Sequence, residues 1–148
     1  MATLSFAAQI AGWAEKVPEA VEAVRNGAAQ DVVKEMQTLD EEGGRLPYET
    51  GFLWASLMAS TSSMPPINQN ANPVDGQLYR FDFGTIEAVI IGADLDDDLY
   101  FGYTASYAAA QEYGAQGRAP AGFVRDAVQN WNEHVNRNAK KVRKVFGL

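Results

Sequence analysis

The chain has 148 residues, of which 47% are apolar and 11% aromatic, enough for one domain with a buried core. It contains no cysteine, which excludes disulfides, thiolate metal ligands and a cysteine nucleophile. The N-terminal residues lack the basic and unbroken apolar segments of a signal peptide, and no stretch reaches the roughly 20 apolar residues of a membrane span. We therefore expect the chain to stay in the cytoplasm in which it is made until it is assembled.

The net charge of −7 is unevenly distributed along the chain. Residues 1–136 carry seven basic side chains against 19 acidic ones, whereas residues 137–148 carry five basic side chains. An acidic body argues against a general nucleic-acid-binding protein, which needs a cationic surface to displace the counterions of phosphate. The basic end is also favoured simply because cations near a helix C-terminus interact well with the helix dipole.

The N-terminal third predicts a long amphipathic helix. Apolar side chains recur every three or four residues, at Phe6, Ile10, Trp13, Val17, Val21, Val24, Ala28, Val32, Met36 and Leu39. We expect this stripe to be buried in the core of the subunit. Pro18 lacks a backbone donor, so we expect a kink or a short break there. The run Asp40–Gly44 should end the helix with a left-handed glycine.

The middle of the chain begins with a short helix and a strand. Thr50 can cap the helix by accepting a hydrogen bond from a backbone N–H, and Leu53 then turns inward. The Ser- and Thr-rich segment 57–64 predicts a strand. A polar loop follows at 65–76, with an asparagine-rich stretch at Pro65–Pro73, and loops of this length are usually functional or disordered.

Three more strands are predicted after this loop. Aromatic residues at 79–83 alternate with polar ones, which is typical of a half-buried strand. The apolar run Ile86–Ile91 predicts a more fully buried strand. An acidic turn at Gly92–Asp98 then leads to a strand at Leu99–Tyr103. With the segment 57–64, these strands give an antiparallel sheet of about four strands.

The last third predicts two helical segments joined by a loop of small residues. The first ends at Glu112-Tyr113-Gly114, and the second opens after Pro120. Apolar positions of the closing helix step by three or four residues, at Phe123, Ala127, Trp131, Val135, Ala139, Val142 and Phe146. This order of elements predicts an α+β fold in one domain, 1–148, with the long N-terminal helix and the C-terminal helices packed on the sheet.

The acidic run Asp94–Asp98 is the one cluster suited to a hard cation such as calcium. It lacks the glycine and the distal glutamate of a calcium loop, which favours a solvated turn. A cytoplasmic module that binds a divalent cation through this turn stays open as an alternative.

His134 is the single histidine, so any acid–base or triad scheme must include it. It lies beside Glu133 with no serine near in sequence, which favours a position on the surface or flank of a helix. An enzyme would require His134 to face a pocket with a carboxylate in reach. Phosphate-binding, dinucleotide-binding and metalloprotease motifs are absent from the sequence, so we predict no catalysis, no metal and no cofactor.

Glu112 and Arg125 lie on consecutive elements and could pair across the loop at 114–122. The pair could be an exposed ion pair worth about 0–1 kcal/mol, or a contact between subunits, and both interpretations stay open. The tryptophans, Trp13, Trp54 and Trp131, are most simply core or core-rim residues, although interfaces also favour tryptophan.

Two blocks of residues carry a resemblance to a known family. The first comprises Pro47, Thr50, Gly51, Leu53 and Ser56, and it follows the long helix. The second comprises Tyr107, Ala108, Glu112, Tyr113, Gly114, Pro120, Phe123, Arg125 and Ala127. In this order and spacing, the chain resembles the neck, or tail-completion, proteins of long-tailed bacteriophages, which are related to tail terminator proteins.

The resemblance implies a structural virion protein that forms a homomeric, commonly hexameric, ring without a cofactor. The ring would join the connector or stopper on the head side to the tail tube or tail terminator, with DNA passing through the opening. A tail terminator that caps the tube is the closest alternative. The candidates for contacts between subunits or with neighbouring rings are Glu112, Arg125, Asn68, Asn70, Lys140, Lys141, Arg143 and Lys144. The protein would reside in the virion, and in the host cytoplasm during assembly.

Overall fold

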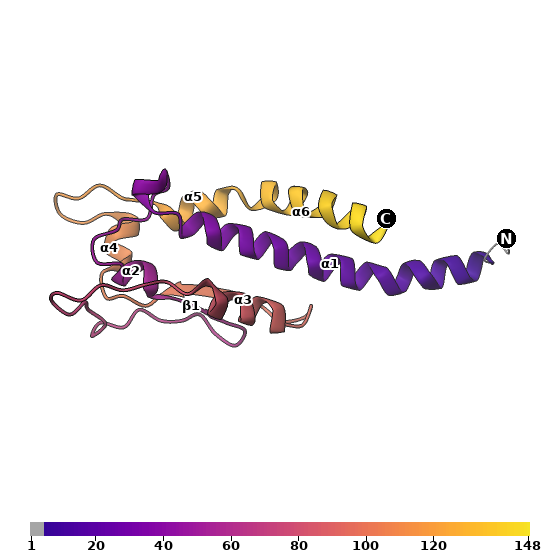
Figure 1. Cartoon of the computed structure of the whole chain (residues 1–148), viewed down its shortest axis with the longest axis horizontal. Helices are drawn as coiled ribbons and strands as arrows, with labels where there is room; N and C mark the ends of the chain where they lie inside the picture. The colour runs from indigo at the N-terminus through magenta and orange to yellow at the C-terminus, as the bar shows by residue number, and fades with distance from the viewer. Residues whose placement is uncertain (1–4) are drawn as a thin grey trace.

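A computed structural model describes residues 5–148, and residues 1–4 lie outside the described part. The elements are, in order, α1 (Phe6–Met36), the 3-10 helix η1 (Asp40–Glu42), α2 (Phe52–Ala55), β1 (Leu57–Ser60), α3 (Phe83–Gly92), β2 (Tyr100–Tyr103), α4 (Ala108–Tyr113), α5 (Phe123–Gln129) and α6 (Trp131–Phe146). Figure 1 shows α1 along the length of the molecule, with α5 and α6 on one side and the strands with α3 on the other. The predicted mixture of a long N-terminal helix, further helices and an antiparallel sheet is therefore present.

The long helix α1 begins where the side chain of Ser5 accepts a hydrogen bond from the backbone N–H of Ala8 at 3.2 Å. Pro18 lies inside α1, which continues to Met36, so of the predicted kink or short break the break is absent. Proline removes one backbone donor, and the turns on both sides of Pro18 nevertheless stay helical. The expectation that the run Asp40–Gly44 ends the long helix is wrong, because α1 ends at Met36 with Gln37 as its cap. Gly43 does take the predicted left-handed conformation, with φ of 93°, but it ends η1.

The sheet consists of two antiparallel strands, with Leu57 opposite Tyr103 and Ser60 opposite Tyr100. The prediction of about four strands is not confirmed, because residues 5–148 form only these two. The strand expected at 57–64 stops at Ser60, whose hydroxyl accepts a hydrogen bond from the backbone N–H of Ser62 and turns the chain. The strand expected at Leu99–Tyr103 is confirmed as β2.

The apolar run Ile86–Ile91 belongs to α3, so the prediction of a buried strand there is wrong. Asp82 caps this helix, because its carboxylate accepts a hydrogen bond from the backbone N–H of Gly84 at 2.9 Å. Ile86 and Ile90, one turn apart, are the buried residues of α3. A short apolar run fits both a buried strand and a helix, and here the cap favours the helix.

The aromatic residues at 79–83 alternate as predicted, yet residues 79–82 are not a strand. Tyr79 packs edge-on against Phe52, with 4.9 Å between the ring centroids, and Phe81 packs against Trp54 at 5.9 Å. The alternation therefore reflects side chains that pack on α2 rather than a ladder of paired strands.

The Thr50–Gly51 turn positions this aromatic segment. The hydroxyl of Thr50 accepts a hydrogen bond from the backbone N–H of Phe52 at 3.3 Å, as predicted, although the N-cap position of α2 is occupied by Gly51. The backbone carbonyl of Thr50 also accepts a hydrogen bond from the N–H of Tyr79 at 2.8 Å. Gly51 has φ of 83°, and a Cβ there would lie 2.3 Å from the carbonyl oxygen of Tyr79, so only glycine permits this approach.

The core surrounds the second half of α1. Its buried members are Ala29, Val32, Val33, Met36, Leu39, Leu46, Leu53, Leu57, Ile86, Ile90, Tyr103, Ala105, Ala108, Phe123 and Ala127. The residues that α1 contributes to this core all lie at or beyond Ala29. The first half of the longest helix is thus outside the main core of the described chain.

Candidate assembly surface

An open apolar groove of 620 Å³ runs between the first half of α1 and α6. It is lined by Trp13, Val17, Ala20, Val21, Val24, Arg25, Trp131, Val135, Ala139, Val142, Arg143 and Leu148. Every lining residue except the two arginines is apolar or aromatic. Contiguous exposed apolar surface of this kind commonly marks a place where another protein binds.

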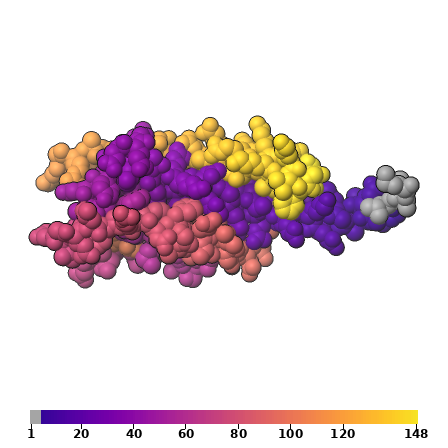
Figure 2. Space-filling view, viewed as in Figure 1, coloured from indigo at the N-terminus to yellow at the C-terminus, as the bar shows by residue number. Residues whose placement is uncertain are grey.

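Toward its N-terminus, α1 extends past the end of α6, and Figure 2 shows its early turns standing apart from the rest of the molecule. The side chains there are open to solvent: Phe6 is 79%, Ile10 50% and Trp13 57% exposed. The prediction that the whole stripe is buried in the core is therefore wrong for this half and holds from Ala28 onward. Apolar spacing defines a face of a helix, but it does not say whether that face meets its own chain.

The tryptophans divide between the groove and the core rim. Trp54 is partly buried and packs against Tyr48 and Phe81, as expected for a core-rim residue. Trp13 and Trp131 instead line the groove and are exposed. Two of the three tryptophans thus belong to a surface of the kind that interfaces favour.

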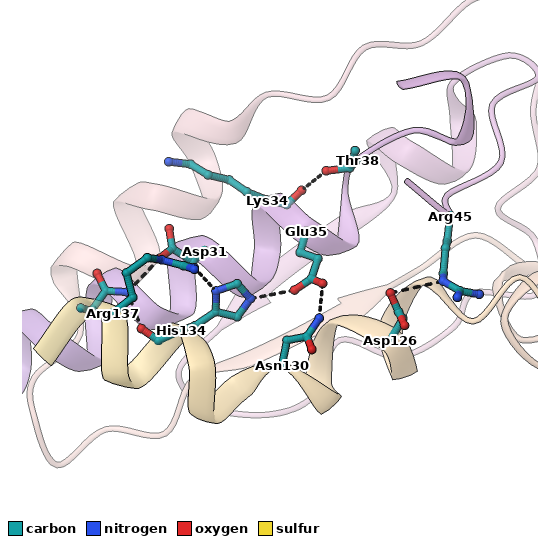
Figure 3. A network of polar contacts seen from close by, with 10 residues as sticks. Asp31, Lys34, Glu35, Thr38, Arg45, Asp126, Asn130, His134 and Arg137 are labelled. Carbon is teal, nitrogen blue, oxygen red and sulfur yellow. Dashed lines mark hydrogen bonds and ion pairs between the residues drawn. The ribbon is translucent and has the colours of Figure 1, made fainter. Parts of the chain in front are cut away.

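A polar network holds α6 against the second half of α1 (Figure 3). The carboxylate of Glu35 accepts hydrogen bonds from the side-chain amide of Asn130 and from Nε2 of His134, the latter at 2.7 Å. The guanidinium of Arg137 donates to Nδ1 of His134. Since a guanidinium has no acceptor, Nδ1 accepts and Nε2 of the neutral ring carries the proton.

His134 is only 8% exposed, so of the predicted position on the surface or flank of a helix the exposed surface is wrong. The prediction rested on its polar neighbours in sequence, which say little about the opposite face of α6. A carboxylate, that of Glu35, is within reach of the ring. Nε2 contacts Glu35 of α1 and Nδ1 contacts Arg137 of α6 itself, so the ring links the two helices through Glu35.

Asp31 extends the network by one turn of α1. Its carboxylate accepts hydrogen bonds from the side chain of Asn138 at 2.8 Å and from Arg137 at 3.4 Å. Burial by itself would raise the pKa of Asp31, but the hydrogen bonds from Asn138 and Arg137 outweigh it and lower the pKa below its ordinary value of 3.8. Gly27 permits this close packing, because a Cβ there would lie 2.1 Å from Oδ1 of Asn138.

This network was not predicted from the sequence, although a signal was present. Polar residues recur at intervals of four on both helices, at Asp31 and Glu35 on α1 and at Asn130, His134 and Asn138. Side chains four residues apart share one face of a helix. Matching polar rows on two helices therefore indicate the part of each helix that meets the other.

Glu112 and Arg125 meet, but not as the predicted pair of side chains. Glu112 is 6% exposed, and its carboxylate accepts hydrogen bonds from the backbone N–H groups of Val124 at 3.0 Å and Arg125 at 2.9 Å. It thereby satisfies the N-terminus of α5, where a negative charge is favoured. The Arg125 guanidinium lies over the ring of Tyr113 instead, 5.8 Å from its centroid. A contact of either residue with another subunit stays a prediction.

The other predicted contact residues lie in two separate places. The backbone N–H of Asn68 donates to the carbonyl of Thr104 at 2.9 Å, and its side chain accepts from the N–H of Asn70 at 2.9 Å. The cationic candidates, Lys140, Lys141, Arg143 and Lys144, are exposed on the last turns of α6. Figure 1 shows the polar loop at 65–76, which holds Asn68 and Asn70, and α6 on opposite sides of α1. These candidates therefore do not form one site.

The acidic turn surrounds an arginine of the chain itself. The Arg25 guanidinium donates to the backbone carbonyls of Asp94 at 2.7 Å, of Ala93 and Leu95 at 3.1 Å, and of Asp97 at 3.2 Å. Arg25 thus places a positive charge of the chain itself against the backbone of the turn. Within residues 5–148, no group of three or more His, Cys, Asp or Glu side chains could hold a metal ion.

No family model, curated protein or solved structure matches this chain. In the part of the chain that the structure describes, no helix is long and apolar enough to cross a bilayer. A proposal for the function therefore rests on the two sequence blocks and on the surface formed by α1 and α6.

Proposed function

We propose that the protein is a structural subunit that assembles with copies of itself into a ring at the head–tail interface of a long-tailed phage. The observation that carries this proposal is the uncovered apolar surface made by the groove between α1 and α6 and by the early turns of α1. A subunit that remained alone would leave this surface in water. A neighbouring subunit would cover it.

The energetic reason for assembly is the size of the exposed side chains. Phe6, Ile10 and Trp13 are all at least half exposed. Burying one large apolar side chain stabilises a protein or a complex by about 1.5–3 kcal/mol. Covering several of them supplies the surplus that association needs to offset the loss of translational and rotational freedom.

The two sequence blocks support the proposal through the fold of the subunit. Thr50 and Gly51 hold the aromatic segment beside α2, and Glu112 caps α5. The first block thus fixes a contact between segments about 30 residues apart, and the second fixes the junction of two consecutive helices. The residues of the two blocks hold the fold of the subunit together. The order and spacing of these blocks in the sequence resemble those of the neck and tail-completion proteins.

The charge distribution suits a ring through which DNA passes. The side chains of the turn Asp94–Asp98 are exposed, and residues 1–136 carry 19 acidic side chains against seven basic ones. A lining of like charge lets a duplex slide without adhering to the wall. In this proposal the ring joins a connector or stopper to the tail tube, without catalysis or a cofactor.

Complementation of a phage that lacks this chain tests the proposal. We expect electron microscopy to show separate filled heads and separate tails of normal length, and the wild-type chain to restore joined particles. Joined particles at the normal yield without the chain would refute a neck function. Tails of uncontrolled length would instead indicate the tail terminator, because an uncapped tube continues to grow.

A further inference from the structure

We infer that Asp75 is a modification site, at which the main chain rearranges to isoaspartate through the backbone nitrogen of Gly76. The inference goes beyond the proposed function and does not depend on it. The chain holds one Asp-Gly sequence, Asp75-Gly76, and one Asn-Gly sequence, Asn26-Gly27. Glycine favours this rearrangement, because it has no side chain that hinders the approach of its own nitrogen to the preceding side chain. The two sequences lie in different surroundings, and only the first is free to react.

The rearrangement needs only these residues and water. The nitrogen of Gly76 attacks Cγ of the Asp75 carboxyl group and a C–N bond forms. The amide hydrogen and the carboxyl hydroxyl leave as water, which gives a cyclic imide. A second water molecule then opens the imide. When it opens at the former main-chain carbonyl, the main chain runs through Cγ and the former carbonyl carbon becomes a free carboxylate. The mass and the oxidation state of the chain are unchanged.

Asp75 and Gly76 are the central residues of an exposed turn. The N–H of Gln77 closes the turn by donating to the carbonyl of Val74 at 3.1 Å. Gly76 has φ of 78°, and a Cβ built there would meet no atom outside the turn within 4 Å. Both central residues are exposed and line an open hollow of 360 Å³. Water therefore reaches the turn, and no neighbouring element blocks the movement of Gly76.

Neither reacting group is held by a hydrogen bond. Within residues 5–148, the backbone N–H of Gly76 has no acceptor and the carboxylate of Asp75 has no donor. By contrast, the carboxylates of Asp82 and Asp97 accept hydrogen bonds from the backbone N–H groups of Gly84 and Asp94. The nitrogen of Gly76 can thus turn toward Cγ without breaking a hydrogen bond, which would otherwise oppose the reaction.

The Asn26-Gly27 sequence is protected by the fold. It lies inside α1, where the N–H of Gly27 belongs to the hydrogen-bond ladder of the helix. The side-chain oxygen of Asn26 accepts hydrogen bonds from the Arg25 guanidinium at 3.1 and 3.2 Å. A Cβ at Gly27 would overlap the side chain of Asn138, so α6 packs closely over this turn. Attack on Asn26, which would release ammonia, therefore requires α1 to open locally.

Isoaspartate changes the end of the polar loop, because it adds a methylene group to the main chain. The N–H of Val74 donates to the hydroxyl of Tyr79 at 3.0 Å, and the N–H of Tyr79 donates to the carbonyl of Thr50 at 2.8 Å. The added group lengthens the chain between these two anchored residues. None of residues 74–79 belongs to the core, so we expect the turn to shift and the core to stay intact.

Ageing of the purified protein at neutral pH tests the inference. Trypsin separates the peptide 46–80, which carries Asp75, from the peptide 26–34, which carries Asn26. Isoaspartyl methyltransferase then labels isoaspartate with methyl groups from S-adenosylmethionine. In the folded protein we expect label in the peptide 46–80. In the peptide 26–34 we expect about tenfold less label from the folded protein than from protein aged in guanidinium chloride, because the reaction there requires α1 to open.

The matched control is Asp75→Glu, which keeps the charge of this exposed residue but would have to form a larger ring. We expect it to lose the label of the peptide 46–80 while its thermal unfolding stays that of the wild type. Absence of label from this peptide in the folded wild-type protein, or equal label in Asp75→Glu, would overturn the inference. Equal label in the peptide 26–34 from folded and unfolded protein would show that the fold does not select the site, and would overturn it as well.

Discussion

The two halves of α1 have the same apolar spacing but different surroundings. From Ala28 to Met36 the apolar residues are buried in the core, and Asp31 and Glu35 on the same half bind α6 through the polar network. From Phe6 to Val24 the helix has α6 beside it only in part, and an open groove remains. The comparison shows that a stripe of apolar residues identifies a face, whereas matched polar partners identify the half that is fixed within the chain.

The largest expected difference between the halves concerns buried volume. Met36→Ala removes a buried side chain, and we expect it to lower the free energy of unfolding by about 2–5 kcal/mol. The matched change Ile10→Ala should alter the unfolding free energy of the single subunit by less than about 0.5 kcal/mol. Urea denaturation of dilute protein measures both, and similar losses at the two positions would contradict the division of the helix.

The polar network should contribute less than the core but more than exposed charges. Glu35→Ala leaves Asn130 and His134 without their shared acceptor, so we expect a loss of about 1–3 kcal/mol in the free energy of unfolding. Glu19→Ala, in the exposed half of the same helix, is the control and should stay within about 0.5 kcal/mol of the wild type. If Glu35→Ala and Glu19→Ala change the free energy of unfolding by the same small amount, the network does not stabilise the fold.

Asp31 should make this half of the helix sensitive to acid. Its pKa is lower in the folded chain than its ordinary value of 3.8, so its stabilisation is present above that value and is lost as the pH falls through the folded-state pKa. Asp31→Asn should therefore be destabilised at neutral pH and lose less further stability on acidification. Thermal unfolding between neutral pH and pH values below 3.8 measures this, and parallel pH profiles for the two proteins would count against it.

The double change Phe6→Ser with Ile10→Ser should leave the fold of the subunit almost unchanged and abolish self-association. Both side chains are exposed in the subunit, so the free energy of unfolding of the single chain should change by less than about 0.5 kcal/mol. Light scattering at several concentrations measures the mass of the particles. An oligomer that persists in the double variant would place the contact outside the early turns of α1.

The smallest effect on the fold should come from the exposed charges. Neutralising Lys140, Lys141, Arg143 and Lys144 should weaken assembly more at low salt than at high salt, because ions screen exposed charges beyond about 8 Å at physiological ionic strength. Neutralising Asp94, Asp96 and Asp98 on the acidic turn is the control and should leave assembly intact. If neither set changes assembly at either salt concentration, the charges serve solubility alone.

Local patterns of the sequence predicted several elements of the fold well. The spacing of the first stripe predicted α1, and Thr50 was correctly expected to accept a backbone hydrogen bond at the start of α2. The left-handed glycine was also predicted, but Gly43 ends η1 rather than α1. Each of these depends on residues close together in sequence. The error at Ile86–Ile91 arose because a short apolar run does not distinguish a buried strand from a helix whose buried residues are four apart.

The apolar groove between α1 and α6 was harder to predict, because it depends on how far α6 extends along α1. Trp13 and Val17 have the same spacing as Val32 and Met36, so periodicity alone could not separate groove from core. Glu112 was correctly placed near Arg125, but the carboxylate binds backbone N–H groups, which sequence patterns of charged residues do not reveal. The role of Arg25 was likewise hidden, since its acceptors are carbonyls about 70 residues away.

The loop between α4 and α5 is fastened at its base. The N–H of Ala121 donates to the carbonyl of Gln111 at 2.9 Å, the N–H of Gly122 donates to the carbonyl of Glu112 at 3.2 Å, and the Glu112 carboxylate holds the start of α5. Because these contacts fix both ends, a foreign peptide inserted at Gly117 would lengthen the loop without displacing either helix. An epitope or a fluorescent label at that position would allow the subunit to be located within an intact particle.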